Sequence, residues 1–200
     1  TLLFTDNTIV GQGATGFLAD MTEDENGRLC LYMVNMRDDI LSEIMYCVYD
    51  NAMNLVDNVN LLEKISTETG DIYHTLKVSE DGSVYIFLDK NDGTVNMYKF
   101  SSENELQYVA EDVTGDMEGH FTQCIITKSG NPVISTYNHG ATGSHHTCFN
   151  ELDADTGEII GRYDTNILEG YLQIVRADNF ENYGDSDILF IQGGKICGYS

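Results

Sequence analysis

Short runs in which apolar and polar residues alternate recur along the whole chain, separated by clusters of Gly, Asn, Asp and Ser. One example is "DGSVYIFLD" at 81–89, which leads through "KNDG" into "TVNMYKF" at 94–100. Alternation with a period of two is typical of half-buried β-strands, and a Gly-containing cluster between two such runs indicates a hairpin. The pattern therefore predicts an all-β fold built from strand pairs.

Three further strand pairs have the same form. They are "NGRLCLYMV" (26–34) with "EIMYCVYD" (43–50), "SGNPVISTY" (129–137) with "HTCFNELD" (146–153), and "YGDSDILFI" from Tyr183 with "GKICGYS" (194–200). The turn glycines that introduce the four pairs, Gly27, Gly82, Gly130 and Gly184, recur at about fifty residues, which in an all-β pattern is the length of a propeller blade. Positions in the second strands repeat at nearly the same spacing: Tyr49, Phe100 and Leu152. We therefore predict a β-propeller of about four blade-like units, either a compact ring or a fragment of a larger one.

Each predicted unit contains four strands. An inner strand precedes the turn glycine, as in 16–21, 72–79, 120–127 and 171–178, and an outer strand follows the pair, as in 105–112 and 158–164. The predicted units span residues 11–65, 66–116, 117–168 and 169–200. The last unit lacks an outer strand, and we expect residues 2–10, with their alternating Leu2, Phe4 and Ile9, to supply one. A β-sandwich or a β-solenoid is the alternative, but a sandwich gives no reason for two landmarks to repeat at one period.

The stretch "LDADTGEIIGRYD" predicts a tight hairpin between a third and a fourth strand, with Gly157 at positive φ and the flanking carboxylates capping turn amides. A similar "TETGDIYH" lies at a neighbouring corner. The first stretch resembles the Asp-x-x-Thr-Gly turn of quinoprotein-like β-propeller repeats, and the other units resemble generic bacterial propeller blades. Quinoprotein enzymes use tryptophans to dock their blades and to stack their cofactor. This chain contains no Trp, so the resemblance implies the architecture without the cofactor.

Charge narrows the function classes. The chain has 33 acidic and 10 basic residues and a formal net charge of -23. Such a surface repels phosphate backbones and anionic lipid, so we expect no nucleic-acid partner. No stretch reaches the roughly 18 uninterrupted apolar residues of a spanning helix, so we expect no membrane insertion. The cysteines are odd in number and irregularly spaced, and most lie in apolar runs; we expect mostly reduced, buried thiols at Cys30, Cys47, Cys124, Cys148 and Cys197.

A glycine-rich stretch, "VGQGATG" at 10–16, contains the spacing of a dinucleotide-binding turn. That chemistry needs a helix whose N-terminal amides hold a pyrophosphate. The following "FLADMTEDEN" is acidic in its second half and has no sustained apolar face, and no βα alternation follows. The sequence favours a propeller loop here.

Two segments carry candidate metal ligands. The stretch "YNHGATGSHHTCFN" contains His139, His145 and His146, and a hairpin through "GATGS" would bring His139 opposite one of the others, as a Zn²⁺ or Cu site requires. The alternative is a polar hairpin. The stretch "ADNFENYGDSDILFI" resembles the calcium loop of FG-GAP-type propeller repeats, which implies Asn179, Glu181 and Asp187 as Ca²⁺ ligands. A solvated turn is the alternative there, and we expect no other cofactor.

No pair of carboxylates and no nucleophile motif is singled out by spacing, so no catalytic residue is assigned. We expect a non-catalytic binding module that docks a protein, peptide or glycan at one end of a central channel. The acidic, Trp-free composition is typical of a bacterial extracellular or cell-surface protein. The alternative is a hydrolase or lyase that acts on a glycan or peptide.

Overall fold

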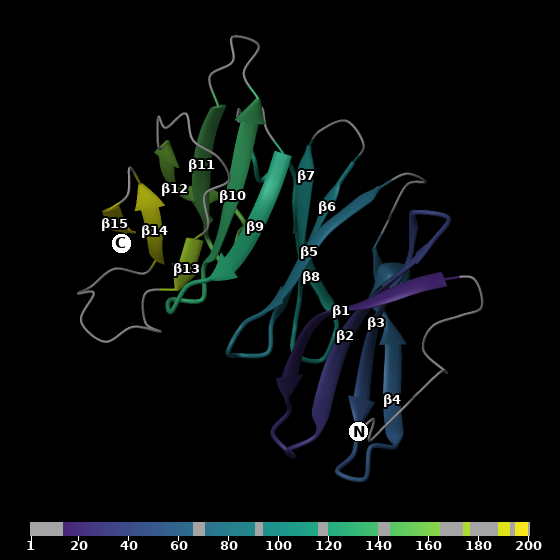
Figure 1. Cartoon of the computed structure of the whole chain (residues 1–200). Coiled ribbons are helices and arrows are strands. Elements are labelled where there is room, and N and C mark those ends of the chain that lie inside the picture. The colour runs from purple at the N-terminus through teal and green to yellow at the C-terminus, as the bar shows by residue number, and fades with distance from the viewer. Residues whose placement is uncertain are drawn as a thin grey trace.

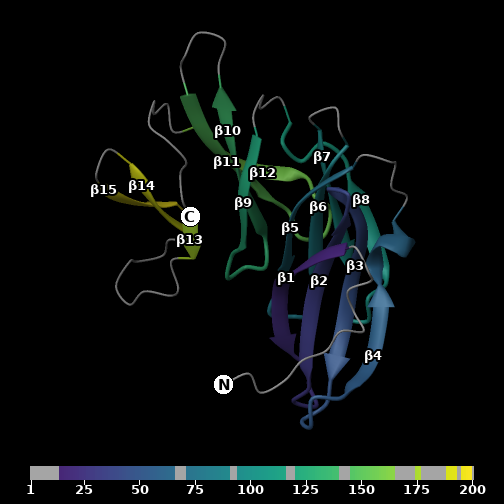
Figure 2. The same ribbon diagram turned by 45° about the vertical axis from the view of Figure 1, so that its right-hand side comes forward.

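The computed structural model describes residues 14–65, 71–90, 94–115, 120–139, 145–164, 174–176, 188–192 and 195–199. Their strands form four successive antiparallel sheets, each made from one segment of chain with its strands in chain order. Figures 1 and 2 show these sheets following one another from the purple first sheet to the yellow last one. The all-β fold predicted from the alternation is confirmed.

The first two sheets have four strands each. The first contains β1 (Ala14–Glu23), β2 (Leu29–Arg37), β3 (Ile40–Tyr49) and β4 (Leu55–Asn60), and a short 3₁₀ turn, η1 (Leu61–Lys64), follows it. The second contains β5 (Ile72–Val78), β6 (Val84–Asp89), β7 (Val95–Phe100) and β8 (Leu106–Ala110). The sequence pattern did not predict η1. It is capped by Asn60, whose side chain accepts a hydrogen bond from the backbone N–H of Leu62.

The third sheet also has four strands, and three strands of the fourth are described. The third contains β9 (His120–Ile126), β10 (Pro132–His139), β11 (His145–Leu152) and β12 (Ile159–Asp164). The fourth contains β13 (Ile174–Arg176), β14 (Ile188–Gln192) and β15 (Lys195–Tyr199). Each sheet lies within one of the predicted units. Residues 2–10 and Gly184 lie outside the described residues.

Neighbouring sheets pack face to face through three apolar clusters. The first joins sheets one and two and includes Val34, Ile44, Ile86 and Phe100; the second joins sheets two and three and includes Phe87, Met97, Ile134 and Leu152; the third joins sheets three and four and includes Val133, Phe149, Ile174 and Phe190. The first strand of each sheet contacts the first strand of the next, from β1 through β5 and β9 to β13. Four consecutive antiparallel sheets with adjacent inner strands are blades of a β-propeller.

Strand β6 shows why an uninterrupted apolar run suits this position. Val84, Ile86 and Leu88 point into the first cluster, whereas Tyr85 and Phe87 point into the second. Because successive side chains of a strand point to opposite faces, a strand between two neighbours buries every one of them. All five are buried. The β-branched and aromatic composition of this run also favours a strand.

The same three-residue hairpin joins the first two strands of the first three blades. In each, the turn glycine has positive φ and donates its N–H to the residue three positions earlier: Gly27 to Asp24, Gly82 to Ser79, and Gly130 to Thr127. This hairpin needs a left-handed residue before the second strand, which glycine supplies without strain. The glycine landmarks in the sequence are therefore confirmed as turn residues for these three blades.

Every one of these inner strands also contains a β-bulge at the same distance from its turn glycine. The extra residues are Ala19, His74 and Thr122 in β1, β5 and β9. The outer strands of the three blades are bulged as well, at Val56, Gln107 and Ile160. Bulges bend a strand and re-aim the side chains around it. The repeat predicted from spacing thus extends to backbone irregularities that the sequence pattern does not reveal.

The predicted "DADTGE" hairpin lies between β11 and β12. Gly157 has a φ of +75° and donates its N–H to Asp153. The Asp153 carboxylate accepts hydrogen bonds from the backbone N–H groups of Asp155 and Thr156, at 2.9 and 2.8 Å. Both predictions for this turn, positive φ and carboxylate capping, are confirmed. The turn also packs against the second blade, because a Cβ at Gly157 would collide with Ala110 and approach Tyr108 and Met97.

All five cysteines lie in described strands, and none forms a disulfide. Cys30, Cys47, Cys124 and Cys148 are buried, and Cys197 is half-buried. The expectation of reduced, buried thiols is confirmed for four of them. Within the described residues, no helix is long and apolar enough to cross a membrane.

Replacing Gly157 by Ala tests the contact between the third-blade turn and the second blade. We expect the free energy of unfolding to fall by about 2–4 kcal/mol, since left-handed strain and overpacking against Ala110 add. Gly130→Ala is the matched control, because its φ is also positive but no atom lies within 4 Å of the new methyl group. It should cost about 1 kcal/mol in urea unfolding. Equal losses in the two variants would contradict the proposed contact.

Candidate functional site

A cavity of about 370 Å³ lies between the inner strands of the second and third blades. It is lined from β5 and β9, where the central channel of a propeller runs: His74, Thr75, Lys77 and Val78 on one side, and Gln123, Cys124, Ile125 and Ile126 on the other. No Asp or Glu is among these residues. In a chain with 33 acidic residues, this is an unusual local composition.

The bulge in β5 determines how His74 is presented. Tyr73 pairs with Leu88 and Thr75 with Phe87, so His74 is the extra residue between them. Its Nε2 lies 3.5 Å from Oδ2 of Asp89, and both side chains are 19% exposed. This contact is an ion pair only when His74 is protonated. His74 therefore lies at the cavity, beside the end of β6.

Lys77 lies on the same face of β5 as Thr75 because the two residues are two positions apart in the strand. The Lys77 side chain is half-buried. Burial raises the pKa of the Cys124 thiol, and the nearby positive charge of Lys77 partly opposes that rise. Lys77 and Cys124 line the same cavity from opposite strands.

The residue that follows each inner-strand bulge connects neighbouring blades at the other two joints. Asp20 in β1 accepts a hydrogen bond at 3.0 Å from the backbone N–H of Val78. Gln123 in β9 donates to the carbonyl of Ile174 at 2.9 Å and accepts from its N–H at 3.2 Å. Thr75 occupies this position in β5, and its shorter side chain makes no such connection within the described residues. The cavity lies at this joint.

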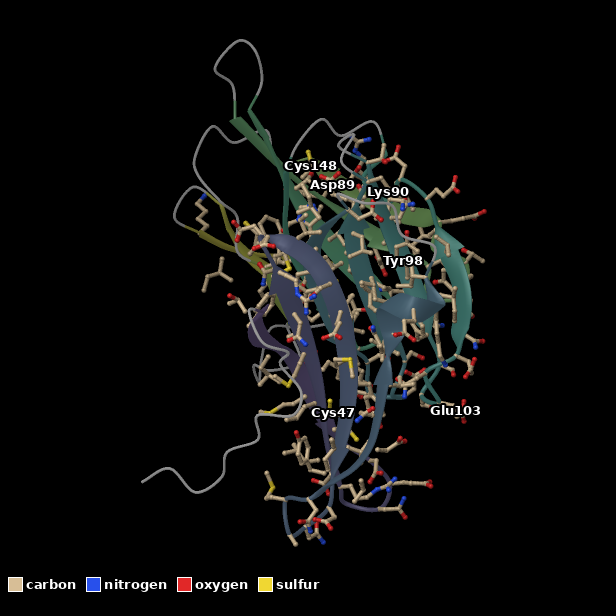
Figure 3. All side chains as sticks on the ribbon, turned by 90° about the vertical axis from the view of Figure 1, so that its right-hand side faces the viewer. Cys47, Asp89, Lys90, Tyr98, Glu103 and Cys148 are labelled. Carbon is tan, nitrogen blue, oxygen red and sulfur yellow. The ribbon has the colours of Figure 1, made fainter. Side chains whose placement is uncertain are left out.

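A partly buried ion pair lies near the same end of the second blade. Nζ of Lys90 is 2.9 Å from Oδ2 of Asp71, whose side chain is only 4% exposed. Burial lowers the pKa of Lys90, but its hydrogen bonds to Asp71 and Tyr98 outweigh burial and raise it overall. Figure 3 shows Asp89 and Lys90 beside each other, with Glu103 at the opposite end of the blade.

Two clefts lie at that opposite end, between the hairpins of adjacent blades. The one between the second and third blades has a volume of about 360 Å³, and the one between the first and second about 570 Å³. Their charged side chains support the turns. Asp81 accepts hydrogen bonds from Ser79 and Ser83, and although burial raises its pKa, these bonds lower it overall. Asp24 likewise forms a 2.7 Å ion pair with Arg28.

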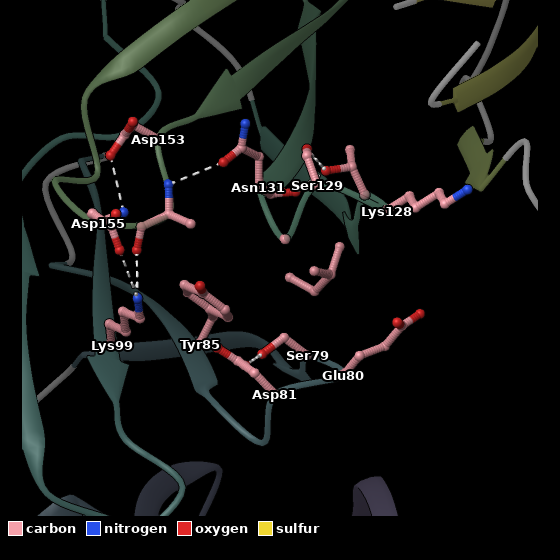
Figure 4. A pocket seen from close by; sticks show the side chains of 14 residues that line it. Ser79, Glu80, Asp81, Tyr85, Lys99, Lys128, Ser129, Asn131, Asp153 and Asp155 are labelled. Carbon is pink, nitrogen blue, oxygen red and sulfur yellow. Dashed lines mark hydrogen bonds and ion pairs between the residues drawn. The ribbon is translucent and has the colours of Figure 1, made fainter. Parts of the chain in front are cut away.

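Lys99 fastens the third-blade turn to the second blade in this cleft (Figure 4). Its Nζ donates to the carbonyl of Ala154 at 2.7 Å and lies 3.6 Å from Oδ1 of Asp155. The ammonium group is 5.7 Å from the ring centre of Tyr85 and 5.8 Å from that of Tyr108. Tyr108 donates to the same Ala154 carbonyl at 2.9 Å. These groups hold two blades together, so we assign this cleft a structural role.

Of the metal ligands predicted from the sequence, only the backbones of the three histidines lie within the described residues. The register of β10 and β11 places the backbone of His139 opposite His145 and that of His146 opposite Asn138. Asn179, Glu181 and Asp187 lie outside the described residues. Among the side chains that the structure describes, no three His, Cys, Asp or Glu residues gather as a metal site would require. Both metal sites stay predictions.

The cavity residues were not singled out by sequence reasoning. His74, Thr75 and Lys77 belong to an ordinary alternating strand, and no motif marks them. Aligning the repeats on Gly27, Gly82 and Gly130 would have revealed the available signal. That alignment places Thr75 level with Asp20 and Gln123, the two residues that join blades elsewhere.

No protein-family model matches the chain, and no curated protein matches it in sequence. Among solved structures, the chain is similar to a luciferin-regenerating enzyme, with a TM-score of 0.44 and 12% sequence identity. The similarity covers 92% of this chain and 64% of that enzyme. At this level the likeness supports no conclusion about activity, and the fold is established by the sheets themselves.

Replacing Asp153 by Ala tests the role of carboxylates in the turns. Hydrogen bonds from the N–H groups of Thr156 and Asp155 hold the pKa of Asp153 below its usual value. The stabilisation is therefore fully present above that usual value and is lost as pH falls through the lower pKa of the folded protein. Asp153→Ala should melt a few degrees below the parent protein at pH 7, and the difference should narrow below about pH 4.

Asp155→Ala is the control for this experiment, because the Asp155 side chain is 93% exposed and its ion pair with Lys99 is long at 3.6 Å. Melting curves recorded by circular dichroism from pH 7 to pH 2 compare the variants. A difference between Asp153→Ala and the parent that does not change with pH would contradict the assignment.

Proposed function

We propose that the chain is a non-catalytic binding module of the propeller type, whose ligand docks in the cavity between β5 and β9. The observation that supports this proposal is the set of polar side chains at the cavity. Thr75 and Lys77 are presented by a paired strand, and neither side chain forms a hydrogen bond or ion pair within the described part of the chain. A small-ligand site needs polar side chains that are held on rigid strands and have no hydrogen-bond partner in the fold.

The two turn clefts fit this role less well. In the cleft between the first and second blades, Asp24 and Asp81 are already bound to turn groups. In the cleft between the second and third blades, Lys99, Asp81 and Asp153 are already bound to turn amides, carbonyls and hydroxyls. A ligand there would have to displace bonds that hold the blades together. A ligand in the inner-strand cavity would meet the Thr75 and Lys77 side chains, which form no hydrogen bond or ion pair within the described residues, so binding would cost less rearrangement.

The size and the charge of the molecule narrow the ligand to a peptide or glycan segment. A volume of about 370 Å³ lies at the lower end of the range for small-ligand pockets. The net charge of -23 disfavours nucleic acid. We further propose that the module belongs to a bacterial secreted or surface protein, which the resemblance of its units to bacterial propeller blades supports.

One observation favours an enzyme as the second candidate. His74 lines the cavity with its Nε2 3.5 Å from the Asp89 carboxylate, and an imidazole near a carboxylate is a common general base. In that case the protein would be a hydrolase or lyase acting on a glycan or peptide. No carboxylate is among the residues that line the cavity, and burial raises the pKa of the Cys124 thiol there, which disfavours a thiolate nucleophile; we therefore rank this reading second.

Titration of the ¹⁵N-labelled protein with galactose, cellotriose, galacturonate and trialanine tests the proposal. We expect at least one ligand to shift the amide resonances of Thr75, Val78 and Gln123 in a saturable manner. The amides of the Asp153 turn should serve as the internal control and stay unchanged. Saturable shifts confined to the turn clefts, or no shifts with any ligand, would contradict the proposal. Chromatography of the same samples would reveal a product, and loss of turnover in His74→Ala would favour the enzyme.

A further inference from the structure

Lys77 differs from every other basic side chain that the structure describes. Four half-buried ones have partners in the fold: Arg28 pairs with Asp24, Lys64 with Glu105, Lys90 with Asp71, and Lys99 with Ala154 and Asp155. The others are exposed to solvent, namely Arg37, Lys128, Arg162 and Lys195. Within this described set, Lys77 alone is half-buried and has neither an ion pair nor a hydrogen bond.

The Lys77 ammonium group has no partner in the described part of the chain, yet it is not among the buried polar atoms that lack one, so it is open to the cavity and its solvent. It therefore offers a positive charge and hydrogen-bond donors that the fold does not use. With 33 acidic residues in the chain, a partner for Lys77 would be easy to supply, yet no carboxylate lines the cavity. Asp20 lies nearby on the first blade, but its carboxylate accepts the N–H groups of Val78 and Met21.

The surroundings of Lys77 are suited to an anion. The hydroxyl of Thr75 lies on the same face of β5 and lines the same cavity, so it can act as a second donor. Gln123 across the cavity is occupied by the backbone of Ile174, which leaves the Lys77 and Thr75 donors for a ligand. Charge-assisted hydrogen bonds from an ammonium and a hydroxyl group to a carboxylate are stronger than neutral ones.

We propose that the inner-strand cavity binds a carboxylate-bearing ligand, with Lys77 pairing with the carboxylate and Thr75 donating a hydrogen bond to it. This inference rests on the proposed binding function and names the chemistry of its ligand. A cavity of about 370 Å³ admits a group the size of a sugar acid or an acidic amino acid. The acidic outer surface repels large polyanions, so a small carboxylate inside the channel is the ligand that both features allow.

The test compares D-galacturonate and L-glutamate with neutral galactose, using the amide shifts of Thr75, Val78 and Gln123. We expect one of the two carboxylates to bind at least about tenfold more tightly than galactose, and its affinity to fall as salt is added. Galacturonate binding would assign the carboxylate to a sugar acid, and glutamate binding would assign it to an acidic amino acid. Each of these two outcomes supports the proposal.

Lys77→Met should weaken carboxylate binding at least about tenfold, whereas Lys77→Arg should retain most of it because the charge is kept. Lys128→Met is the matched control, since Lys128 is exposed on the turn between β9 and β10, and it should bind as the parent does. Melting temperatures of all variants confirm that they are folded. Lys77→Met should melt close to the parent, because the Lys77 ammonium forms no hydrogen bond or ion pair within the described residues.

Two results would overturn the inference in distinguishable ways. If galactose binds as tightly as the carboxylates and Lys77→Met binds them unchanged, the cavity is a binding site but not one for carboxylates. If no ligand shifts the β5 and β9 amides, the proposed function fails together with the inference.

Discussion

The structure depends on the burial of both faces of its sheets. The second sheet shows this most clearly, because alternate residues of β6 enter different clusters: Ile86 packs toward the first sheet and Phe87 toward the third. Each fully buried side chain of this kind contributes about 1.5–3 kcal/mol relative to an exposed one. A sheet packed on both faces cannot shift its register by one residue without exchanging these two sets. Face-to-face packing therefore fixes the order of the blades and the register within them.

This packing also places the inner strands side by side, and the β-bulges in these strands change the direction of the side chains that face the next blade. At two joints the residue after the bulge, Asp20 or Gln123, connects one blade to the next. At the joint between the second and third blades the same position is Thr75, and the cavity with Lys77 lies there. One repeated position therefore has two roles. In β1 and β9 its side chain bonds the neighbouring blade, whereas in β5 its side chain, Thr75, makes no such bond within the described residues and lines the cavity. Carboxylates have a different role. Asp24, Asp81 and Asp153 accept hydrogen bonds within turns, so they lie at the ends of the blades and not at the cavity.

Much of the fold was predictable because its signals are local. Alternation identified the strands, and Gly27, Gly82, Gly130 and Gly157 marked the turns, since each of these positions requires positive φ. The short turn η1 was missed because "LLEK" carries no period of its own. The candidate site was not predictable in the same way. Lys77 looks like any other lysine in a strand, and its lack of a partner appears only when β5 and β9 are placed together. The His139 site was predicted from composition and from the expected hairpin, and the strand register places the backbone of His139 opposite His145.

Nuclear Overhauser contacts between side chains test the central claim, that the second sheet is packed between the first and the third, most directly. The methyl groups of Ile86 should show contacts to Val34 or Ile44 of the first sheet. The ring of Phe87 should show contacts to Ile134 or Leu152 of the third. Contacts from both Ile86 and Phe87 to the same neighbouring sheet, or from either one to solvent-exposed positions only, would contradict the propeller arrangement and the cavity that depends on it.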